Sequence, residues 1–363
     1  MKHTPVSLRS WDDDKQHHQN DVGHVRGIAV RTAVPSLFHN SNSDRDAMKQ
    51  LSLTWRVIAS GHGPGPRSRH GLVYDRQSRM IVLFGGIDWE QNTLLSDTWE
   101  FRRGKWKKIE VPNEPPPRHR GAMVYDSVRG YAVLFGGQTR GVGTWPFLDD
   151  TWLYQDNCWT RQTGWFWKSP PARCGHSMAF DEDSGQTVMF GGVGSHDEPL
   201  GDTWAFDGRW LQLKCDGPPA RRYAAFAYHP GLKGCVLHGG SVDDNGNEQF
   251  GDAWLFREQR WSPLGHIYGT DSRDDHGLAF HEALGKMVML EGLLRDEDGR
   301  IKREVLVMTK VGWREIDVDP IHPRHQCSPL VYDSSLGGLV LHGGEAGHGG
   351  SQFDKTLLLR VHE

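Results

Sequence analysis

Residues 67–106 read RSRHGLVYDRQSRMIVLFGGIDWEQNTLLSDTWEFRRGKW, and this stretch decides the fold. It contains an arginine-led segment ending in Tyr-Asp at 74–75, an apolar run at 81–84 followed by Gly-Gly, an Asp-Thr-Trp segment at 97–99 and a final tryptophan. Short apolar runs bounded by Gly, Asp and Asn are typical of β-strands rather than helices. The stretch therefore predicts four short strands joined by turns.

The same pattern returns along the whole chain with a nearly constant period. One tryptophan column advances in steps of 51, 53, 51, 51 and 52 residues: Trp55, Trp106, Trp159, Trp210, Trp261 and Trp313. A column of glycine pairs keeps the same phase: Gly85-Gly86, Gly136-Gly137, Gly191-Gly192, Gly239-Gly240 and Gly343-Gly344. Self-similarity at a fixed period is the signature of a repeat architecture. Residues 52–363 accommodate six such units.

These columns resemble the kelch repeat in all six units. The marks are the arginine-led strand, the Gly-Gly strand end, the acid-Thr-Trp strand and the final tryptophan strand. The resemblance implies an all-β fold, a six-bladed β-propeller of four-stranded antiparallel blades around a channel. We name the strands of each blade A to D from the channel outward.

The phase of the repeat also predicts how the ring closes. A seventh tryptophan would fall beyond Glu363, while an orphan strand from Leu53 to Ile58 precedes the first unit. We expect this N-terminal strand to complete the last blade, which removes the exposed sheet edge. The propeller is therefore expected over residues 51–363. Residues 1–50 are polar without periodicity and are predicted to be a disordered extension.

Composition limits the class of partner. The chain has 42 basic and 46 acidic residues and a formal charge of −4, which provides no field for nucleic acid or an anionic membrane. No apolar segment approaches the roughly 18 residues of a membrane span, and no export signal is visible, so we expect a cytoplasmic protein. The five cysteines lack metal-ligand spacing and are interpreted as reduced thiols.

No metal or cofactor is predicted. His70, His176 and His276 share one column, but they fit the repeat's own Arg-x-Gly-His pattern, which Arg173 to His176 matches literally. Repeat chemistry explains this column better than a metal site does.

Loop lengths predict which face binds a ligand. In a four-stranded meander the B to C loops and the D to A loops lie at the same end of every blade. The turns at the opposite end are short, whereas the B to C loops run to about ten residues. Long loops on a rigid scaffold are where binding usually occurs, so the B to C and D to A end is expected to be the binding face, here called the loop face.

A column of basic residues lies seven positions before the aromatic residue of strand A: Arg67, Arg118, Arg173, Arg221, Arg273 and His325. Guanidiniums gathered at a channel mouth would suit carboxylates, and the resemblance to kelch adaptor domains that capture acidic peptides implies ligand contacts at these positions. An equally regular acid column begins strand C: Asp97, Asp150, Asp202, Asp252, Glu304 and Asp354. Pairing between the two columns, which would make both of them structural, is the alternative.

Four tryptophans within residues 51–363 depart from the repeat. Trp89 and Trp145 are in B to C loops, and Trp165 and Trp167 lie between the second and third units. Exposed aromatics beside arginines are typical of interface anchors and sugar-stacking platforms, although they also pack loops. We include these four among the candidate ligand-binding residues.

These patterns favour a non-catalytic binding module that captures an acidic peptide, a protein segment or another anionic ligand on the loop face. Some kelch propellers are enzymes, so the first alternative is a small-sugar enzyme, such as a sialic acid mutarotase-like epimerase, using the same mouth with unidentified catalytic residues. A purely structural scaffold is the third possibility.

Overall fold

The computed structural model describes residues 52–142, 144–163, 168–243, 248–265, 268–290, 304–318, 325–346 and 351–361. The extension predicted over residues 1–50 lies outside these ranges, as do Trp165 and Trp167. In the described ranges, no helix is long and apolar enough to cross a membrane.

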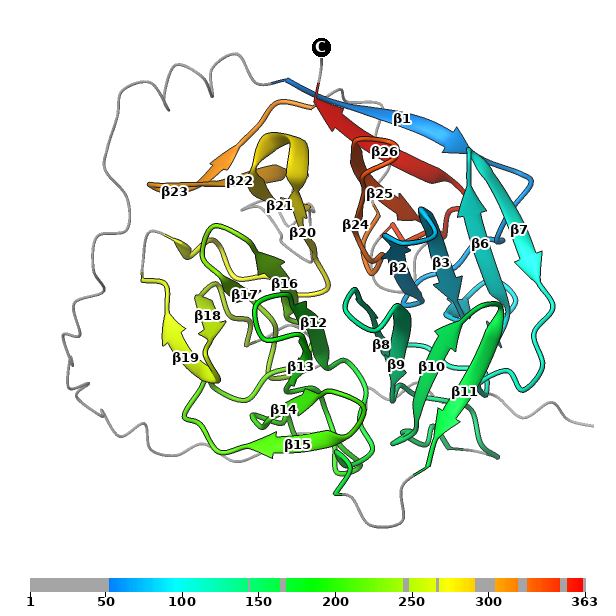
Figure 1. The fold of residues 1–363 in the computed structure, drawn as a ribbon, viewed down its shortest axis with the longest axis horizontal. Coiled ribbons are helices and arrows are strands. Elements are labelled where there is room, and N and C mark those ends of the chain that lie inside the picture. The colour runs from blue at the N-terminus through cyan, green and yellow to red at the C-terminus, as the bar shows by residue number, and fades with distance from the viewer. Residues whose placement is uncertain are drawn as a thin grey trace, which may run out of the picture. The chain divides into compact units, whose positions relative to one another are not determined.

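The chain forms six four-stranded antiparallel sheets arranged as the blades of a ring (Figure 1). Blade 1 contains β2 (Gly71–Asp75), β3 (Met80–Phe84), β6 (Thr98–Arg102) and β7 (Lys105–Ile109). Blade 2 contains β8 (Ala122–Asp126), β9 (Tyr131–Phe135), β10 (Thr151–Gln155) and β11 (Cys158–Gln162). Blade 3 contains β12 (Ser177–Asp181), β13 (Gln186–Phe190), β14 (Thr203–Phe206) and β15 (Trp210–Leu213).

The remaining blades follow the same order, and the all-β, six-bladed fold predicted from the repeat is confirmed. Blade 4 contains β16 (Ala225–His229), β17 (Gly234–His238), β18 (Ala253–Arg257) and β19 (Arg260–Pro263). Blade 5 contains β20 (Gly277–His281), β21 (Lys286–Leu290), β22 (Val305–Thr309) and β23 (Gly312–Glu315), with a 3-10 turn at Glu282–Leu284. Blade 6 contains β24 (Val331–Asp333), β25 (Gly338–His342), β26 (Thr356–Val361) and β1 (Leu53–Ala59).

The N-terminal strand closes the ring as predicted. Strand β1 pairs antiparallel with β26, with Leu53 opposite Val361 and Trp55 opposite Leu359. Figure 1 shows the two strands side by side, one from each end of the propeller sequence. Leu53 is fully buried in the core between blades 5 and 6, so the outer strand is held by packing as well as by its hydrogen bonds.

Neighbouring blades are joined through two columns of the repeat. The indole Nε1 of Trp159 in strand D of blade 2 donates to Thr98 Oγ1 of blade 1 over 2.9 Å. The same bond joins Trp210 to Thr151, Trp261 to Thr203 and, across the ring closure, Trp106 to Thr356. A buried indole N–H needs an acceptor, and the threonine of the acid-Thr-Trp segment supplies it.

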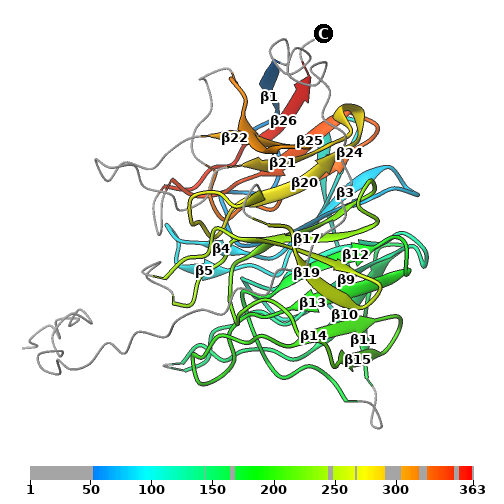
Figure 2. The same cartoon turned by 90° about the vertical axis from the view of Figure 1, so that its left-hand side faces the viewer.

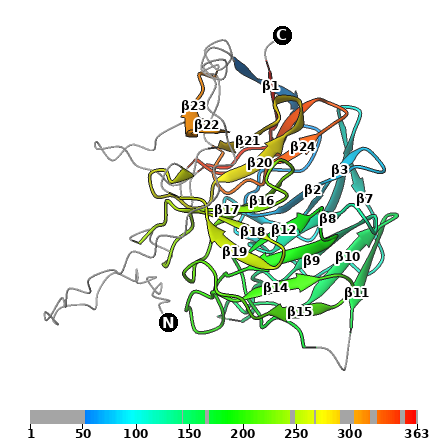
Figure 3. The same ribbon diagram turned by 60° about the vertical axis from the view of Figure 1, so that its left-hand side comes forward.

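The two ends of the blades differ as the loop lengths predicted. Strands A and B are joined by tight turns; in blade 1, Asp75 Oδ1 accepts from the backbone N–H groups of Gln77 and Ser78. At the other end, the B to C loop of blade 1 is long enough to form a hairpin of β4 (Ile87–Asp88) and β5 (Thr93–Leu94). Figure 2 shows this hairpin at the left of the propeller, and Figure 3 shows the blades as successive layers of strands.

Candidate functional site

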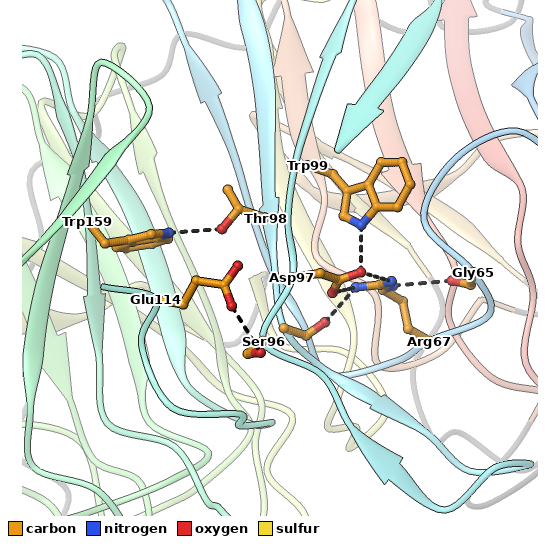
Figure 4. Close-up of polar contacts among 9 residues, drawn as sticks. Gly65, Arg67, Ser96, Asp97, Thr98, Trp99, Glu114 and Trp159 are labelled. Atoms are coloured by element: carbon orange, nitrogen blue, oxygen red, sulfur yellow. Dashed lines mark hydrogen bonds and ion pairs between the residues drawn. The ribbon is translucent and has the colours of Figure 1, made fainter. Parts of the chain in front are cut away.

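The arginine column is buried inside the blades and paired with the acid column. In blade 1, Arg67 Nη1 and Nη2 donate to Asp97 Oδ1 and Oδ2 over 2.7 and 2.9 Å (Figure 4). The same guanidinium donates to the carbonyls of Gly65 and Gly85, and Trp99 Nε1 donates to Asp97 Oδ2 over 2.6 Å. One arginine therefore ties strand C to the D to A loop and to the end of strand B.

This arrangement recurs, and none of the five arginines is more than 2% exposed. The other pairs are Arg118 with Asp150, Arg173 with Asp202, Arg221 with Asp252 and Arg273 with Glu304. Burial opposes ionisation of the paired aspartates, but hydrogen bonds from the arginine and its charge outweigh burial and lower their pKa. The arginine column is thus paired with the acid column in the structure, and ligand contact by these arginines stays a prediction.

The sixth member of the column, His325, is also turned into the protein. Its Nδ1 hydrogen-bonds to the carbonyl of Gly343, and its ring lies 4.7 Å from the ring of Phe353, centroid to centroid. Burial lowers the pKa of His325 to about 4, so the imidazole is neutral at pH 7. A neutral, buried ring does not add a cation to the mouth.

A second column, two residues further on, surrounds the channel mouth on the loop face. Its members are Arg69, Arg120, Gly175, Tyr223, Asp275 and Cys327, here called the mouth ring. All six have a left-handed backbone, with φ of 57°, 57°, 60°, 57°, 51° and 57° respectively. Each backbone N–H donates to the carbonyl of the preceding blade's member, and Arg69 N–H donates to Cys327, so the ring of hydrogen bonds is closed.

The mouth ring encloses a cavity of about 160 Å³, lined by the ring residues and the start of the A strands. Sequence reasoning missed this site. The signal that could have found it is Gly175, the glycine of the Arg-x-Gly-His pattern, which the other five units replace with residues that carry side chains. Left-handed backbone favours glycine, so these five replacements mark the position as unusual.

Stacking orients two side chains of the mouth ring. The ring of Tyr223 lies over Gly175, where an added Cβ would fall 2.3 Å from Tyr223 Cε1. The guanidinium carbon of Arg120 lies 4.7 Å from the centroid of the same ring. Because glycine leaves room for the tyrosine, blades 2, 3 and 4 together fix the direction of Arg120.

On the other side of the mouth, Arg69 forms a buried ion pair with Glu345 of blade 6 at 2.9 Å. The thiol of Cys327 lies 3.0 Å from Glu345 Oε1 and 3.3 Å from Asp275 Oδ2. Burial and the two neighbouring carboxylates raise the pKa of Cys327, so it is a thiol hydrogen-bond donor rather than a thiolate. Cys327 therefore contacts the carboxylates of both Glu345 and Asp275.

Trp89 and Trp145 belong to a row of aromatic and cationic side chains in contact across the loops of blades 1 and 2, here called the cation–aromatic stack. Its order is Arg69, Trp89, His119, Trp145 and Arg140. The Arg69 guanidinium carbon lies 5.3 Å from the Trp89 ring and that of Arg140 4.7 Å from the Trp145 ring, while the ring of His119 contacts both indoles. Trp89 is half-buried, whereas Trp145 is 39% exposed, so the stack reaches the surface at its blade 2 end.

The channel also widens at the opposite face into a cavity of about 690 Å³. Aromatic residues at the ends of the A strands line it: Tyr74, Tyr125, Phe180, Tyr228, Phe280 and Tyr332. Hydroxyls of these tyrosines are used between blades; Tyr74 bonds Ser334 over 3.0 Å and Tyr228 bonds Asp183 over 2.7 Å. We place the candidate site at the mouth ring instead, since that end has the long loops and the side chains that break the repeat.

The histidine column packs between blades. The ring of His176 lies against Phe135, His276 against His238, and His70 against His342. In the part of the chain that the structure describes, no three His, Cys, Asp or Glu side chains form a group that could hold a metal ion.

Comparison with known proteins finds several curated relatives of part of the chain. It is 31% identical over 174 residues to an F-box/kelch-repeat protein of Arabidopsis thaliana, covering 43% of this chain and 35% of that protein. It is 31% identical over 222 residues to Adagio-like protein 3 of Oryza sativa subsp. japonica, covering 56% and 33%. It is 30% identical over 199 residues to the dynein alpha chain of the flagellar outer arm of Chlamydomonas reinhardtii, covering 49% and 4%.

The chain therefore spans about a third or less of the length of these curated relatives. No protein-family model matches it. Among solved structures, that of YjhT is similar with a TM-score of 0.63 and 12% identity, over 84% of this chain and 99% of that one. At this identity the likeness concerns the fold alone.

Proposed function

We propose that this six-bladed β-propeller, which is similar to an F-box/kelch-repeat protein, is a non-catalytic binding module that captures an acidic peptide or protein segment on its loop face. The observation that carries the proposal is the cation–aromatic stack beside the mouth ring. Arg140 is exposed, Trp145 is 39% exposed, and Arg120 is half-buried at the cavity. Arginine and tryptophan are the residues that most often anchor interfaces.

The stack is preorganised for such a role. Arg140 is held over Trp145 by two hydrogen bonds to Asn92 of the neighbouring blade, 2.9 Å to the carbonyl and 2.6 Å to the side-chain oxygen. Holding the guanidinium in place before the ligand arrives reduces the entropy lost on binding. An acidic side chain would meet a fixed cation beside an aromatic surface.

A charge-selective binding assay tests this proposal. Fluorescence anisotropy of labelled decaglutamate and decalysine would be measured against the full chain at 0.15 M salt, where the screening length is about 8 Å. We expect decaglutamate alone to bind, and Arg140→Ala and Trp145→Ala each to weaken it about tenfold. Lys107→Ala, an exposed cation on the outer strand β7, is the matched control and should change nothing.

Two outcomes count against the binding module. If all three variants bind decaglutamate as the wild type does, the cation–aromatic stack is not where it binds. If decaglutamate does not bind at all, the loop face is not an acid-capturing surface. The structural scaffold would then be favoured.

One observation keeps the small-sugar enzyme as a second candidate. Burial, followed by the charge of Asp275, raises the pKa of Asp274 to about 7, which suits a general acid or base at neutral pH. Asp274 is only 3% exposed and accepts from Gln249 Nε2 over 2.9 Å, and it is the next residue in the chain to Asp275, which lines the cavity at the mouth. The test follows anomer interconversion of sialic acid by NMR with the wild type and Asp274→Asn; catalysis requires a wild-type rate above that of buffer which the variant loses.

A further inference from the structure

The mouth ring carries opposite charges on opposite sides of its cavity. In the closed order of hydrogen bonds, Arg120 of blade 2 and Asp275 of blade 5 are three members apart in a ring of six. Both side chains are half-buried and both line the cavity. Both charges act on the next residue in the chain. Burial and then the charge of Arg120 lower the pKa of His119, whereas burial and then the charge of Asp275 raise the pKa of Asp274.

The backbone does not explain why these side chains are present. A left-handed conformation costs a non-glycine residue roughly 1–2 kcal/mol, and Gly175 shows that glycine serves the ring equally well. Arg120, Tyr223 and Asp275 therefore occupy left-handed backbone positions that glycine would adopt without this strain. Strained residues gathered around one cavity are grounds for a functional hypothesis.

The size of the cavity limits what can enter. About 160 Å³ corresponds to roughly five water molecules at the volume each occupies in the liquid, and lies below the 300 Å³ or so at which drug-sized pockets begin. A single residue-sized group fits, whereas an extended ligand must remain on the surrounding loops. Such a group would have the guanidinium of Arg120 on one side and the carboxylate of Asp275 on the other.

We propose that the mouth ring binds one dipolar group, with a carboxylate at Arg120 and an ammonium at Asp275, as in a free acidic amino acid or the N-terminal acidic residue of a peptide. This inference rests on the proposed capture of an acidic segment and adds that the site recognises a free ammonium together with the carboxylate. The carboxylate suits the planar donor set of arginine, and the ammonium would add a second cation beside Asp275 and Glu345, of which Glu345 is already paired with Arg69. Tyr223, stacked on Arg120, acts as a positioning residue.

Calorimetric titration of the full chain with three probes tests the proposal. The probes are Glu-Gly-Gly amide, the same peptide with an acetylated N-terminus, and free glutamate. We expect acetylation to weaken binding to the wild type at least tenfold. In Asp275→Asn the two peptides should bind alike, because the partner of the ammonium has lost its charge. Asparagine tolerates left-handed backbone, so this variant should fold.

A glycine substitution tests the positioning role. Gly175→Ala would push the Tyr223 ring away from its place beneath Arg120 and should weaken all binding probes. Gly285→Ala is the matched control, because Gly285 has nearly the same φ, 61° against 60°, with no atom near an added Cβ. Both variants carry the same backbone strain, so only a difference between them reports on the mouth.

The outcomes separate this inference from the proposed function. Equal binding of the free and acetylated peptides to the wild type overturns the dipolar site while leaving acid capture intact. An acetylation effect that persists unchanged in Asp275→Asn also overturns it. Binding of free glutamate alone, abolished in Asp275→Asn, supports the dipolar site and identifies an amino acid as its source. Binding of none of the three probes overturns it.

Discussion

Acidification should unfold this propeller well above the pH at which carboxylates titrate. Eight histidines are no more than 8% exposed, and the pKa of each is lowered first by burial: His70, His119, His176, His238, His276, His281, His325 and His342. Burial lowers the pKa of His238 to about 3 and that of His281 to about 4. In the unfolded chain the same groups titrate near 6.5.

The sign follows from which state binds more protons. Below pH 6.5 these histidines bind protons in the unfolded chain but not in the folded one, so stability is lost as the pH falls. Between pH 7 and 5.5 each buried histidine costs about 1.3 kcal/mol, which makes roughly 10 kcal/mol for eight. Asp274, whose pKa is raised to about 7, acts in the opposite direction and returns about 2 kcal/mol. Total stabilities are about 5–15 kcal/mol, so the acid midpoint should lie at about pH 5–6.

Urea unfolding followed by tryptophan fluorescence between pH 7 and 5.5 measures this slope. His238 and His342 stand where blades 1 to 3 have Phe84, Phe135 and Phe190, so His238→Phe and His342→Phe are substitutions that the fold already accepts. The double variant should lose about a quarter of the pH dependence, since two of the eight groups are removed. Stability that is flat over this range, or a slope that the double variant leaves unchanged, would refute the reasoning.

Three further predictions concern how the ring is held together. Leu53→Ala should destabilise the protein by about 2–5 kcal/mol, while Val57→Ala on the same strand, at 53% exposed, should cost far less, as measured by urea unfolding. Thr98→Val should cost about 1–3 kcal/mol because it leaves the buried Trp159 indole without its acceptor, whereas Thr98→Ser should retain most of that; equal losses would contradict the bond's role. Arg173→Ala should cost about 3–5 kcal/mol at pH 7, visible as a lower thermal midpoint, because Asp202 is left without its partner.

The fold could be predicted from the sequence because the residues that determine it recur in every unit of the repeat. Each unit contains the same strand ends, turn residues and interblade tryptophan, so columns such as Trp106, Trp159 and Trp210 identify strands, their order and the blade count together. The closure by β1 followed from phase alone, since Trp55 begins the tryptophan column that Trp313 ends. The periodic residues are those that every blade needs in order to pack against the next blade.

Only the tertiary structure decided which side chains of the repeated columns contact one another. Arg67 and Asp97 were both visible in the sequence, but their bidentate bond, which occupies the arginine inside the blade, is a matter of geometry. The mouth ring depends on left-handed backbone and on hydrogen bonds between residues about 50 positions apart, and the contact of Arg69 with Glu345 forms only when the last blade meets the first. Residues that break the repeat take partners from other blades as well as from their own, so their chemistry depends on which of them the closed ring brings together.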